Sequence, residues 1–566
     1  MARTIGIGTQ SFEKIREYQY FYVDKTNFIK EWWENGDDVT LITRPRRFGK
    51  TLTINMVETF FSVNYAGRED IFKDLSIWQE EKYQKLQGTW PMISLSFADI
   101  KEVTYEMAQY KINQLLANLY SRFRFIKDSP MLTTKDRDYW ERVSVNMNVS
   151  DASLVLHNLS EYLYRYYGKK VIILLDEYDT PMQEAYVYGY WEELTGFIRS
   201  FFNSTFKTNP CLGRAIMTGI TRISKESVFS DLNNLEIVTT TSRKYESSFG
   251  FTQEEVSAAL AEYGLSDQQG KVKDWYDGFT FGRLTDVYNP WSIINYLEKK
   301  RFSAYWVNTS SNTLVGKLIQ ESNSNIKIAM EDLLNGKAFH TRMDEQIVFS
   351  QLENRESAIW SLLLASGYLR VEHYFFDEER GRDEYDLVLT NKEVRLMFEE
   401  MIEGWFARDT QKYNGFIKAL LQGDCKAMNH YMNRVALETF SFFDSGKRPS
   451  ESTEPERFYH GFVLGLLVEL RERYVVISNR ESGFGRYDVM LEPLHQEEDA
   501  IILEFKVYDS DEEQTLSDTV ASALTQIKEK AYAASLEAKG ISPERIRSYG
   551  FAFEGKKVLI GEDKHV

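Results

Sequence analysis

Short apolar runs in the first part of the chain predict strands buried in a sheet. Residues 39–43 read VTLIT, residues 171–175 read VIILL, and residues 214–223 read RAIMTGITRI. The β-branched side chains favour strands, and an unbroken apolar run is typical of a parallel strand covered on both faces. The first run leads into LTINMVETFF (52–61), whose apolar spacing is helical. This order of elements predicts an α/β domain with a parallel sheet.

Residues 355–402 show a second pattern, which predicts a winged-helix-like module. An apolar helix at 359–366 ends at Gly367, and two strand patterns follow, YLRVEHYFF and EYDLVLT. The charged turn DEERGRD joins them, and a helix capped by Thr390 or Asn391 comes next. Such a wing contacts DNA in one interpretation and only packs on its neighbours in the other. We favour packing, because the turn is not net basic and phosphate contacts need cations.

Near the C-terminus, two charged residues interrupt an apolar strand pattern. Residues 501–507 read IILEFKV, which sets Glu504 and Lys506 among apolar neighbours. Side chains alternate between the faces of a strand, so Glu504 and Lys506 share one face with Ile502 and Tyr508, and the opposite face carries Leu503, Phe505 and Val507. Neighbouring patterns predict a mixed α/β domain with a helix at 455–470, a strand at 482–494, a helix at 517–540 ended by Gly540, and a last strand at 548–561.

Composition indicates which broad class of protein the chain belongs to. The chain has 566 residues, of which 43% are hydrophobic and 27% charged, as in ordinary folded proteins. The net charge of −17 argues against a surface coated in nucleic acid and leaves room for a local basic groove. Cys211 and Cys425 are too few and too far apart for a disulfide framework or a zinc cluster. With no apolar segment typical of a signal peptide or a membrane span, we expect a soluble cytoplasmic protein with no membrane partner.

Two stretches are candidates for domain boundaries. Residues 443–458, FDSGKRPSESTEPERF, are rich in Ser, Pro, Gly and charge, as linkers are. A weaker boundary lies near 247–256, where Thr252 and Glu255 form the capping box of a new helix. We therefore expect three domains, at 1–250, 251–445 and 446–566.

Between the first strand and its helix lies RPRRFGKT (44–51), a phosphate-binding pattern. The Walker A pattern is G-x-x-x-x-G-K-[ST], and its second half is present as GKT, while Arg44 replaces the leading glycine. We expect Gly49 to let the backbone approach a phosphate, Lys50 to reach the β- and γ-phosphates and Thr51 to bind Mg²⁺. The following helix directs its N–H groups at the same anion. The alternative is a surface turn that contains GKT by chance.

The second apolar strand ends in two carboxylates, Asp176 and Glu177, as a Walker B strand does. We expect Asp176 to hold Mg²⁺ and Glu177 to orient or activate the attacking water, because ligands bind at the carboxyl ends of parallel strands. The third strand places Thr218 where a residue between nucleotide and water would lie. Arg222 follows it and is either a phosphate contact, in the same or a neighbouring subunit, or an exposed basic residue.

These segments resemble the AAA-ATPase-like proteins of gut and other anaerobic bacteria over residues 4–310. The resemblance rests on FYVDKT, RPRRFGKTLT, ILLDEYDTP, MTGITRISKESVFSDLNNL, WYDGFTFG and VYNPWSIINYL. An arginine-rich loop without the first glycine is usual in that family. The resemblance implies ATP and Mg²⁺ as ligands and places these residues near the nucleotide: Tyr22, Asp24, Lys25, Arg46, Arg47 and Phe48.

The charged strand at 501–507 gains a partner if the strand at 486–492 pairs with it as a hairpin. Asp488 then reaches Glu504, and two carboxylates beside Lys506 form a site for Mg²⁺ or Mn²⁺. Such a metal activates water and stabilises charge on a phosphate, while the lysine positions or deprotonates the water. The alternative is a solvated surface face that carries Glu504 and Lys506.

This constellation resembles the PD-(D/E)XK nuclease superfamily over residues 455–566, with Asp488, Glu504 and Lys506 on its motif. The resemblance implies that Gln526, on the helix after the motif, touches the active site. It also implies that an acidic residue on the first helix of the domain can add a metal ligand. Glu456, which shares a helix face with His460, is the candidate.

Together these features predict an ATP-binding and ATP-hydrolysing protein that controls a metal-dependent nuclease. DNA is favoured over RNA as the substrate, a homo-oligomer through the ATPase domain is one expected arrangement, and the domain pairing suggests defence against foreign nucleic acid. One alternative is a nucleotide-switched regulator that binds nucleic acid or protein without cutting. Another is a nuclease that needs no nucleotide, with the N-terminal domain as an assembly platform.

Overall fold

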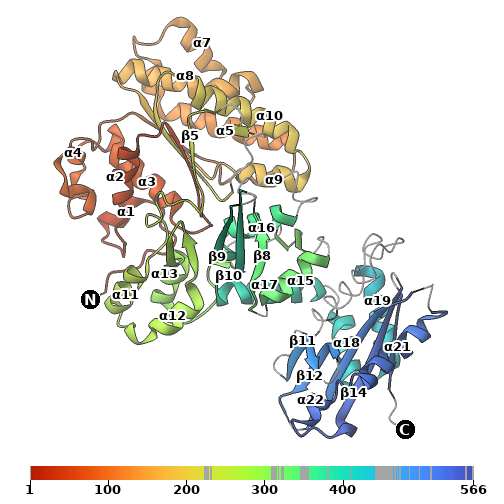
Figure 1. The fold of residues 1–566 in the computed structure, drawn as a ribbon. Helices are drawn as coiled ribbons and strands as arrows, with labels where there is room; N and C mark the ends of the chain where they lie inside the picture. The colour runs from red at the N-terminus through yellow and green to blue at the C-terminus, as the bar shows by residue number, and fades with distance from the viewer. Residues whose placement is uncertain are drawn as a thin grey trace. The chain divides into compact units, whose positions relative to one another are not determined.

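The chain forms two compact units in the computed structural model, and each is described by itself (Figure 1). The first contains Met1–Leu314 and Ala338–Arg395, and the second contains Val315–Lys337 and Leu396–Val566. The domain limits at residues 250 and 445 stay predictions. The structure describes residues 2–563 except for 222–227, 230–231, 308–314, 317, 320–323, 335, 344–355, 379–380, 408–409, 440–462, 464–466, 468–469, 471–472, 483–484, 496, 510–512 and 555–556.

A five-stranded parallel sheet forms the core of the first unit, in the order β2-β3-β4-β1-β5. Every residue of β1 and β3 is buried, as their unbroken apolar sequences predict. Strand β1, which leads into RPRRFGKT, is thus separated by β4 alone from β3, which ends in Asp176. The strand bounds are β1 Val39–Thr43, β2 Met92–Ser96, β3 Val171–Asp176, β4 Leu212–Gly219 and β5 Leu235–Val238.

Helices cover both faces of this sheet, with α2 and α3 on one side and α5, α8 and α10 on the other (Figure 1). Their bounds, with those of the shorter helices nearby, are α1 Phe12–Glu17, α2 Asn27–Asn35, α3 Lys50–Phe61, α4 Glu81–Gln84, α5 Tyr105–Arg122, α6 Arg124–Lys127, α7 Thr134–Arg142, α8 Val149–Tyr167, α9 Thr180–Tyr188 and α10 Trp191–Phe202. No helix among the described residues is long and apolar enough to span a membrane.

A helical region follows the sheet. Thr252 and Glu255 form the predicted capping box at the start of α11. The elements are α11 Gln253–Glu262, α12 Gln269–Tyr276, the hairpin of β6 Phe279–Phe281 and β7 Leu284–Val287, and α13 Pro290–Lys299.

The winged-helix-like pattern is also present in the first unit. Helix α16 precedes an antiparallel sheet of order β8-β10-β9, and Asn391 caps α17 by accepting a hydrogen bond from the backbone N–H of Val394 (3.1 Å). The bounds are β8 Phe339–Arg342, α16 Glu356–Ala365, β9 Leu369–Asp377, β10 Arg382–Leu389 and α17 Lys392–Ala407. Helix α17 belongs to the first unit only as far as Arg395.

The second unit contains a mixed five-stranded sheet of order β11-β12-β13-β14-β15, in which β13 and β14 are parallel and the other neighbours antiparallel. Strands β12 and β13 form the predicted hairpin. The elements are α15 Ser324–Leu334, α18 Thr410–Gln422, α19 Cys425–Thr439, β11 Tyr474–Ser482, β12 Gly485–Pro493, β13 Ala500–Val507, α21 Leu516–Glu529, α22 Ala534–Glu537, β14 Ile546–Glu554 and β15 Lys557–Glu562.

Two predicted elements of this unit were wrong in extent. The helix at 517–540 is broken between α21 and α22, because Ala531 has the left-handed φ of 51° and ends the helical repeat. Tyr532 is thereby turned into a buried apolar cluster. The last strand is a hairpin, because the chain reverses after Glu554, which pairs with Lys557.

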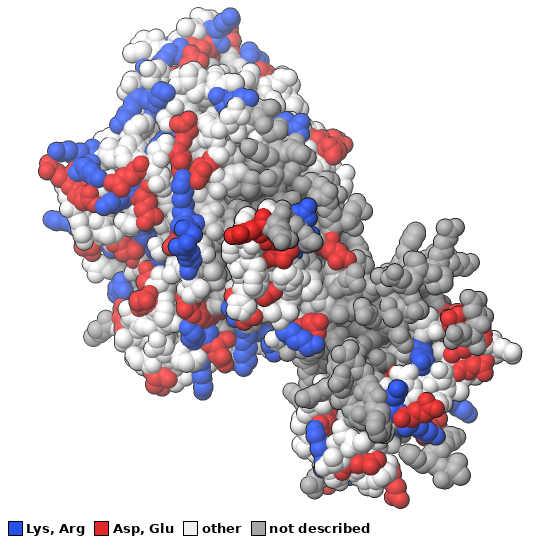
Figure 2. All heavy atoms as spheres, viewed as in Figure 1, with Lys and Arg blue, Asp and Glu red and all other residues white. Residues whose placement is uncertain are grey.

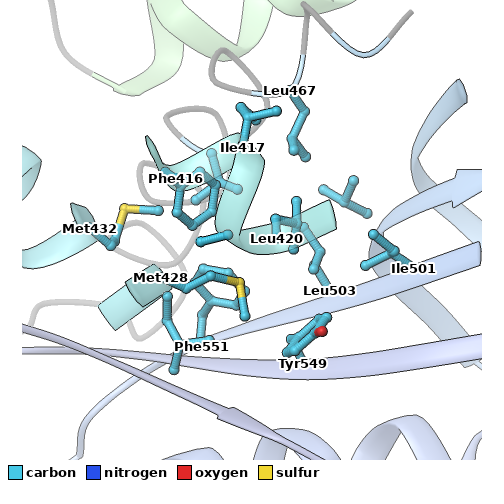
Figure 3. Close-up of a cluster of buried hydrophobic side chains, with 14 of the residues drawn as sticks. Phe416, Ile417, Leu420, Met428, Met432, Leu467, Ile501, Leu503, Tyr549 and Phe551 are labelled. Atoms are coloured by element: carbon cyan, nitrogen blue, oxygen red, sulfur yellow. The ribbon is translucent and has the colours of Figure 1, made fainter. Parts of the chain in front are cut away.

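The two faces of β13 are buried differently, as its alternating sequence predicts. Leu503 and Phe505 belong to a large apolar cluster with α18, α19 and β14, and Figure 3 shows Phe416, Leu420 and Met428 close to Leu503. Ile502 lies on the other face, in the cluster that includes Ile527 of α21. The face with Ile502 is the one that carries Glu504 and Lys506.

Positive and negative side chains are mixed over the described surface that Figure 2 presents. Lys and Arg stand among Asp and Glu on both units in that view. This distribution agrees with the net charge of −17 in giving no indication of a surface coated in nucleic acid.

Candidate nucleotide and nuclease sites

The phosphate loop joins β1 to α3 at the carboxyl edge of the sheet. Gly49 has a φ of 84°, in the left-handed region that favours glycine, and nothing lies within 4 Å of where a Cβ would stand. Arg47 also has a positive φ of 65°. Helix α3 begins at Lys50, directly after Gly49, so the unpaired N–H groups of its first turn lie at this loop. This arrangement is typical of a phosphate-binding loop.

Lys50 is buried, with 6% of its surface exposed, which is against the surface-turn alternative. Its Nζ donates to the carbonyl oxygens of Arg44 and Pro45, both at 2.8 Å. Burial lowers the pKa of Lys50 to about 8, against the opposing effect of Glu177 and Asp176. An ammonium group desolvated in this way interacts strongly with an anion that reaches it.

Asp176 and Thr218 lie at the carboxyl ends of the neighbouring strands β3 and β4, and Thr51 meets them from the N-terminus of α3. The Thr51 hydroxyl donates to Oδ2 of Asp176 (2.7 Å), and the Thr218 hydroxyl donates to Oδ1. Burial raises the pKa of Asp176, and the two hydroxyl groups oppose that rise. Because β4 lies between β1 and β3, Thr218 comes between the phosphate loop and the acidic strand end. A hydroxyl and a carboxylate side by side are the oxygen ligands that Mg²⁺ prefers.

Glu177 stands next to this group in a strained backbone conformation. Its φ is 51°, which is uncommon for a residue with a side chain. The backbone N–H points to Oγ1 of Thr218 (3.4 Å), and the carboxylate accepts a hydrogen bond from the Thr180 hydroxyl (3.1 Å). Glu177 directly follows β3, at the place where a residue that orients water would be needed.

The arginine-rich part of the loop has three different environments. Arg46 is exposed and donates to Oε1 of Gln183 (3.4 Å), whereas the guanidinium of Arg47 lies 4.6 Å from the ring centroid of Trp291. Phe48 is buried against Phe279 and Phe281 of the β6–β7 hairpin. The side chain of Phe48 is therefore part of the core, and only its backbone is left to contact a nucleotide. Arg222 lies outside the described residues.

Arg44, at the position of the missing glycine, anchors the loop. It is fully buried, and its guanidinium donates to the carbonyl oxygens of Thr43 (2.9 Å) and Thr239 (2.6 Å). The group also lies 4.7 Å from the ring centroid of Phe281. Burial lowers the pKa of Arg44 to about 9. This role could not be predicted from a local pattern, since the carbonyl of Thr239 is almost 200 residues away.

The FYVDKT segment has structural contacts. Lys25 donates to both carboxylate oxygens of Glu255 (2.7 Å each). Asp24 accepts hydrogen bonds from the backbone N–H groups of Thr26 and Ser76. Tyr22 is half-buried and directs its hydroxyl to Sδ of Met56 on α3 (3.4 Å). These contacts tie the N-terminal segment to α3 and α11, so the expected place of the three side chains beside the nucleotide stays a prediction.

The winged-helix-like module touches the phosphate loop. A Cβ at Gly367 would stand 2.9 Å from Cγ of Pro45, so only glycine allows this approach. On the loop's other flank, Asn289 at the start of α13 donates to the carbonyl oxygen of Arg46 (3.3 Å). The loop is therefore packed between the helical region and the wing module.

In the second unit, Glu504 is 3% exposed, which excludes the solvated-surface alternative for this residue. Nε2 of Gln526 donates to Oε1 of Glu504 and also lies 3.2 Å from the Tyr532 hydroxyl. Lys506 is half-buried further along the same strand. The structure thus brings Glu504 and Gln526 together as predicted, and it adds Tyr532, which the expected unbroken helix had concealed.

Asp488 is placed by its backbone alone. Val489 pairs with Leu503 and Met490 with Ile502 in the antiparallel β12–β13 ladder. Continued by one residue, this register sets Asp488 opposite Glu504. The Asp488 side chain and the whole of Glu456 lie outside the described part of the chain. Among the side chains that are described, no group of three or more His, Cys, Asp or Glu could hold a metal ion.

Comparisons with known proteins agree with this division of the chain. A family described as predicted AAA-ATPase matches residues 6–229, and the PD-(D/E)XK nuclease superfamily matches residues 454–563. The chain therefore combines an AAA-ATPase-like domain with a C-terminal domain of the PD-(D/E)XK nuclease superfamily. The parallel sheet, the helical and winged-helix-like middle and the mixed C-terminal sheet confirm the predicted fold class.

One individual protein is similar in sequence over most of the chain, and one solved structure aligns with it at low similarity. An "uncharacterized protein in vnfD 5′ region" of Azotobacter chroococcum mcd 1 is 24% identical over 574 residues, 98% of each chain. A signal transduction ATPase with numerous domains and a tetratricopeptide repeat sensor, from Pyrococcus horikoshii, aligns with 80% of this chain at 12% identity and a TM-score of 0.25. This chain spans 56% of that structure. The TM-score is too low to indicate a shared fold.

Proposed function

We propose that the chain is an ATP-binding and ATP-hydrolysing protein coupled to a metal-dependent nuclease. The observation that carries the ATP half is the contact of Asp176 with both Thr51 and Thr218 at the mouth of the phosphate loop. The observation that carries the nuclease half is the buried Glu504 held by Gln526, on the same face as Lys506. Each group lies within the residues that the corresponding family model matches.

The residues of the first site fit ATP with Mg²⁺. The open side of Gly49 and the N-terminus of α3 would receive the phosphates, with Lys50 as the charge partner of the β- and γ-phosphates. Thr51 and Asp176 would hold Mg²⁺, which neutralises phosphate charge when bound. Thr218 keeps Asp176 in place, and Glu177 orients the attacking water and accepts its proton. Arg46 and Arg47 add positive charge to this edge of the sheet, and a phosphate contact by Arg222 stays a prediction.

The residues of the second site fit Mg²⁺ or Mn²⁺. Asp488 and Glu504 would be the ligands, with Glu456 as an additional one, and the bound ion activates water and stabilises charge on the phosphodiester. Gln526 orients the carboxylate of Glu504 through a direct hydrogen bond. Lys506, on the same face and closer to solvent, positions the water that attacks the phosphorus. The products are a phosphate ester and a hydroxyl-ended strand.

DNA is our preferred substrate over RNA, and defence against foreign nucleic acid is the proposed setting. The wing module acts as a packing element in this proposal, since its hairpin turn is not basic. Through the contact of Gly367 with Pro45, a movement of the phosphate loop would displace the wing module. Assembly into a homo-oligomer through the ATPase domain is part of the proposal.

ATP binding and turnover test the first half. We expect the purified chain to bind ATP in Mg²⁺ and hydrolyse it, and Lys50→Ala to abolish both, because the buried ammonium is the main charge partner of the phosphates. Glu177→Gln should retain binding and lose turnover by a factor of roughly 100 or more. ATP binding that is equal in Lys50→Ala and the unmodified chain would refute this half.

A further inference from the structure

Asp179, the last acid of the DEYD sequence, has no part in the proposed ATP chemistry, yet it is buried with 1% of its surface exposed. Its Oδ2 accepts hydrogen bonds from the backbone N–H groups of Ile220 (3.0 Å) and Thr221 (2.8 Å). The Thr221 hydroxyl donates to the same oxygen (2.8 Å). One carboxylate oxygen at the end of β3 thus holds the segment that leaves β4.

A second contact holds the same segment. The hydroxyl of Tyr178 donates to the carbonyl oxygen of Thr221 (2.8 Å). A Cβ at Gly219 would stand 2.6 Å from Cε1 of Tyr178 and 2.7 Å from Oδ1 of Asp179. No side chain fits there, so residues 219–221 lie directly against the end of β3.

Residues 219–221 are next in sequence to a residue of the proposed ATP site. Thr218, which binds Asp176, immediately precedes the segment, and Arg222 immediately follows it. Asp179 also accepts a hydrogen bond from Nε2 of Gln183 (3.1 Å), and Oε1 of Gln183 faces Nη2 of Arg46 (3.4 Å). The carboxylate therefore connects the end of β3, the end of β4 and the phosphate loop.

Burial of a carboxylate is costly, and burial raises the pKa of Asp179. A neutral side chain would fill the same space at a lower cost. What the carboxylate adds is an acceptor strong enough for several donors on one oxygen. That property is useful where a backbone segment must be held within a fraction of an ångström.

We propose that Asp179 is a positioning residue of the ATP site, which fixes residues 219–221 so that Thr218 meets the γ-phosphate. This inference rests on the proposed ATP binding. ADP lacks the γ-phosphate, so Asp179 should matter for ATP and little for ADP.

The test compares the full chain with Asp179→Ala, Asp179→Asn and Thr221→Val. The measurements are the Kd values of a fluorescent ATP and ADP analogue in Mg²⁺, the kcat and KM of ATP hydrolysis, and the Tm. Asp136→Ala is the matched control, because one oxygen of Asp136 likewise accepts hydrogen bonds from the N–H and hydroxyl of a single threonine and from Arg165. That cluster lies at the start of α7.

We expect Asp179→Ala to lower kcat roughly 100-fold, as small displacements in an active site do. The preference for ATP over ADP should be lost, with the Kd of ADP changed less than about threefold. Asp179→Asn, which keeps an oxygen acceptor, and Thr221→Val, which removes one donor, should fall between this variant and the unmodified chain. Asp136→Ala should lower the Tm and leave kcat and both Kd values unchanged.

The inference is overturned if Asp179→Ala lowers only the Tm, as Asp136→Ala does, and keeps both kcat and the preference for ATP. If Asp179→Ala does not fold, the same comparison with Asp179→Asn and Thr221→Val decides. A failure of the underlying proposal looks different. In that case the unmodified chain itself binds neither nucleotide.

Discussion

At the scale of single residues, the buried ammonium group of Lys50 makes the proposed ATP site sensitive to pH. Lys50 has 6% of its surface exposed and is surrounded by carbonyl oxygens and by the carboxylates of Asp176 and Glu177. Burial disfavours the ammonium form and lowers the pKa of Lys50 to about 8. ATP is an anion and prefers the ammonium form, so binding and protonation are linked.

Affinity for ATP should therefore fall as the pH rises through about 8, the pKa of Lys50. Above that value the neutral amine dominates, and the charged fraction drops about tenfold per pH unit. Titration calorimetry at pH 7, 8 and 9 should show the weakening and an uptake of protons on binding at pH 9. Lys50→Met should bind weakly at all three values. A constant affinity of the unmodified chain from pH 7 to 9 would contradict this account.

At the proposed nuclease site, the side-chain amide of Gln526 holds the carboxylate of Glu504. Gln526→Leu keeps the size of the side chain and removes the donor to Glu504, so Mn²⁺ affinity and cleavage should each fall about 10- to 100-fold. Thr525→Ala, on the exposed neighbouring residue of α21, is the control and should change neither. The measurement is Mn²⁺ binding by electron paramagnetic resonance, counting only the signal that Glu504→Ala removes. Equal binding by Gln526→Leu and Thr525→Ala would rule out the role of the amide.

Residues tied to a local pattern could be predicted from the sequence, and residues tied to a distant partner could not. Lys50, Asp176 and Thr218 follow from the spacing of GKT and from the ends of apolar strands. Arg44 could be noticed only as a departure from the pattern, because its carbonyl acceptor at Thr239 is distant in sequence. The contact of Tyr532 with Gln526 was concealed for another reason. It needs the left-handed turn at Ala531, which apolar periodicity does not encode.

At the scale of elements, glycine controls how closely α21 lies on its sheet. A Cβ at Gly550 of β14 would stand 2.9 Å from the carbonyl oxygen of Val520 and 3.0 Å from Cβ of Ala523. A Cβ at Gly561 of β15 would meet Val520 at 2.4 Å. These glycines let the helix approach, and the helix carries Gln526 to Glu504. The packing of one helix thus sets the geometry of the site.

Gly550→Ala should destabilise the second unit by about 1–3 kcal/mol, because the added methyl group meets backbone that has no room to shift. Gly196→Ala, at an exposed position within α10 where nothing lies within 4 Å, should instead stabilise by up to about 1 kcal/mol. Urea unfolding of both variants measures the difference. A Gly550→Ala variant with unchanged stability and cleavage would show that α21 does not need the close approach.

The positions of strands could be predicted because β-branched apolar runs strongly favour strands. The ends of helices and strands could not be predicted in the same way. The helix expected at 517–540 continued its pattern through a break at Ala531, and the strand expected at 548–561 continued through a reversal after Glu554. Both errors lie where a tertiary contact overrides a local preference. Tyr532 gains burial in one case, and β15 gains a partner strand in the other.

At the scale of the molecule, the chain passes between its two compact units more than once. Residues 315–337 belong to the second unit, although residues 338–395 return to the first. The chain therefore passes between the units at 314–315, at 337–338 and at 395–396. Within the first unit, the wing module that lies between two of these passages contacts Pro45 of the phosphate loop through Gly367.

The most direct test of an ATP-coupled nuclease is cleavage of plasmid, single-stranded DNA and RNA in Mg²⁺ or Mn²⁺, with and without ATP. The account predicts cleavage of DNA whose rate changes with ATP. Lys506→Ala should lose cleavage and keep ATP hydrolysis, while Lys50→Ala should lose the response to ATP. No cleavage of any substrate in either metal, with Lys506→Ala and the unmodified chain alike in every assay, would contradict the account.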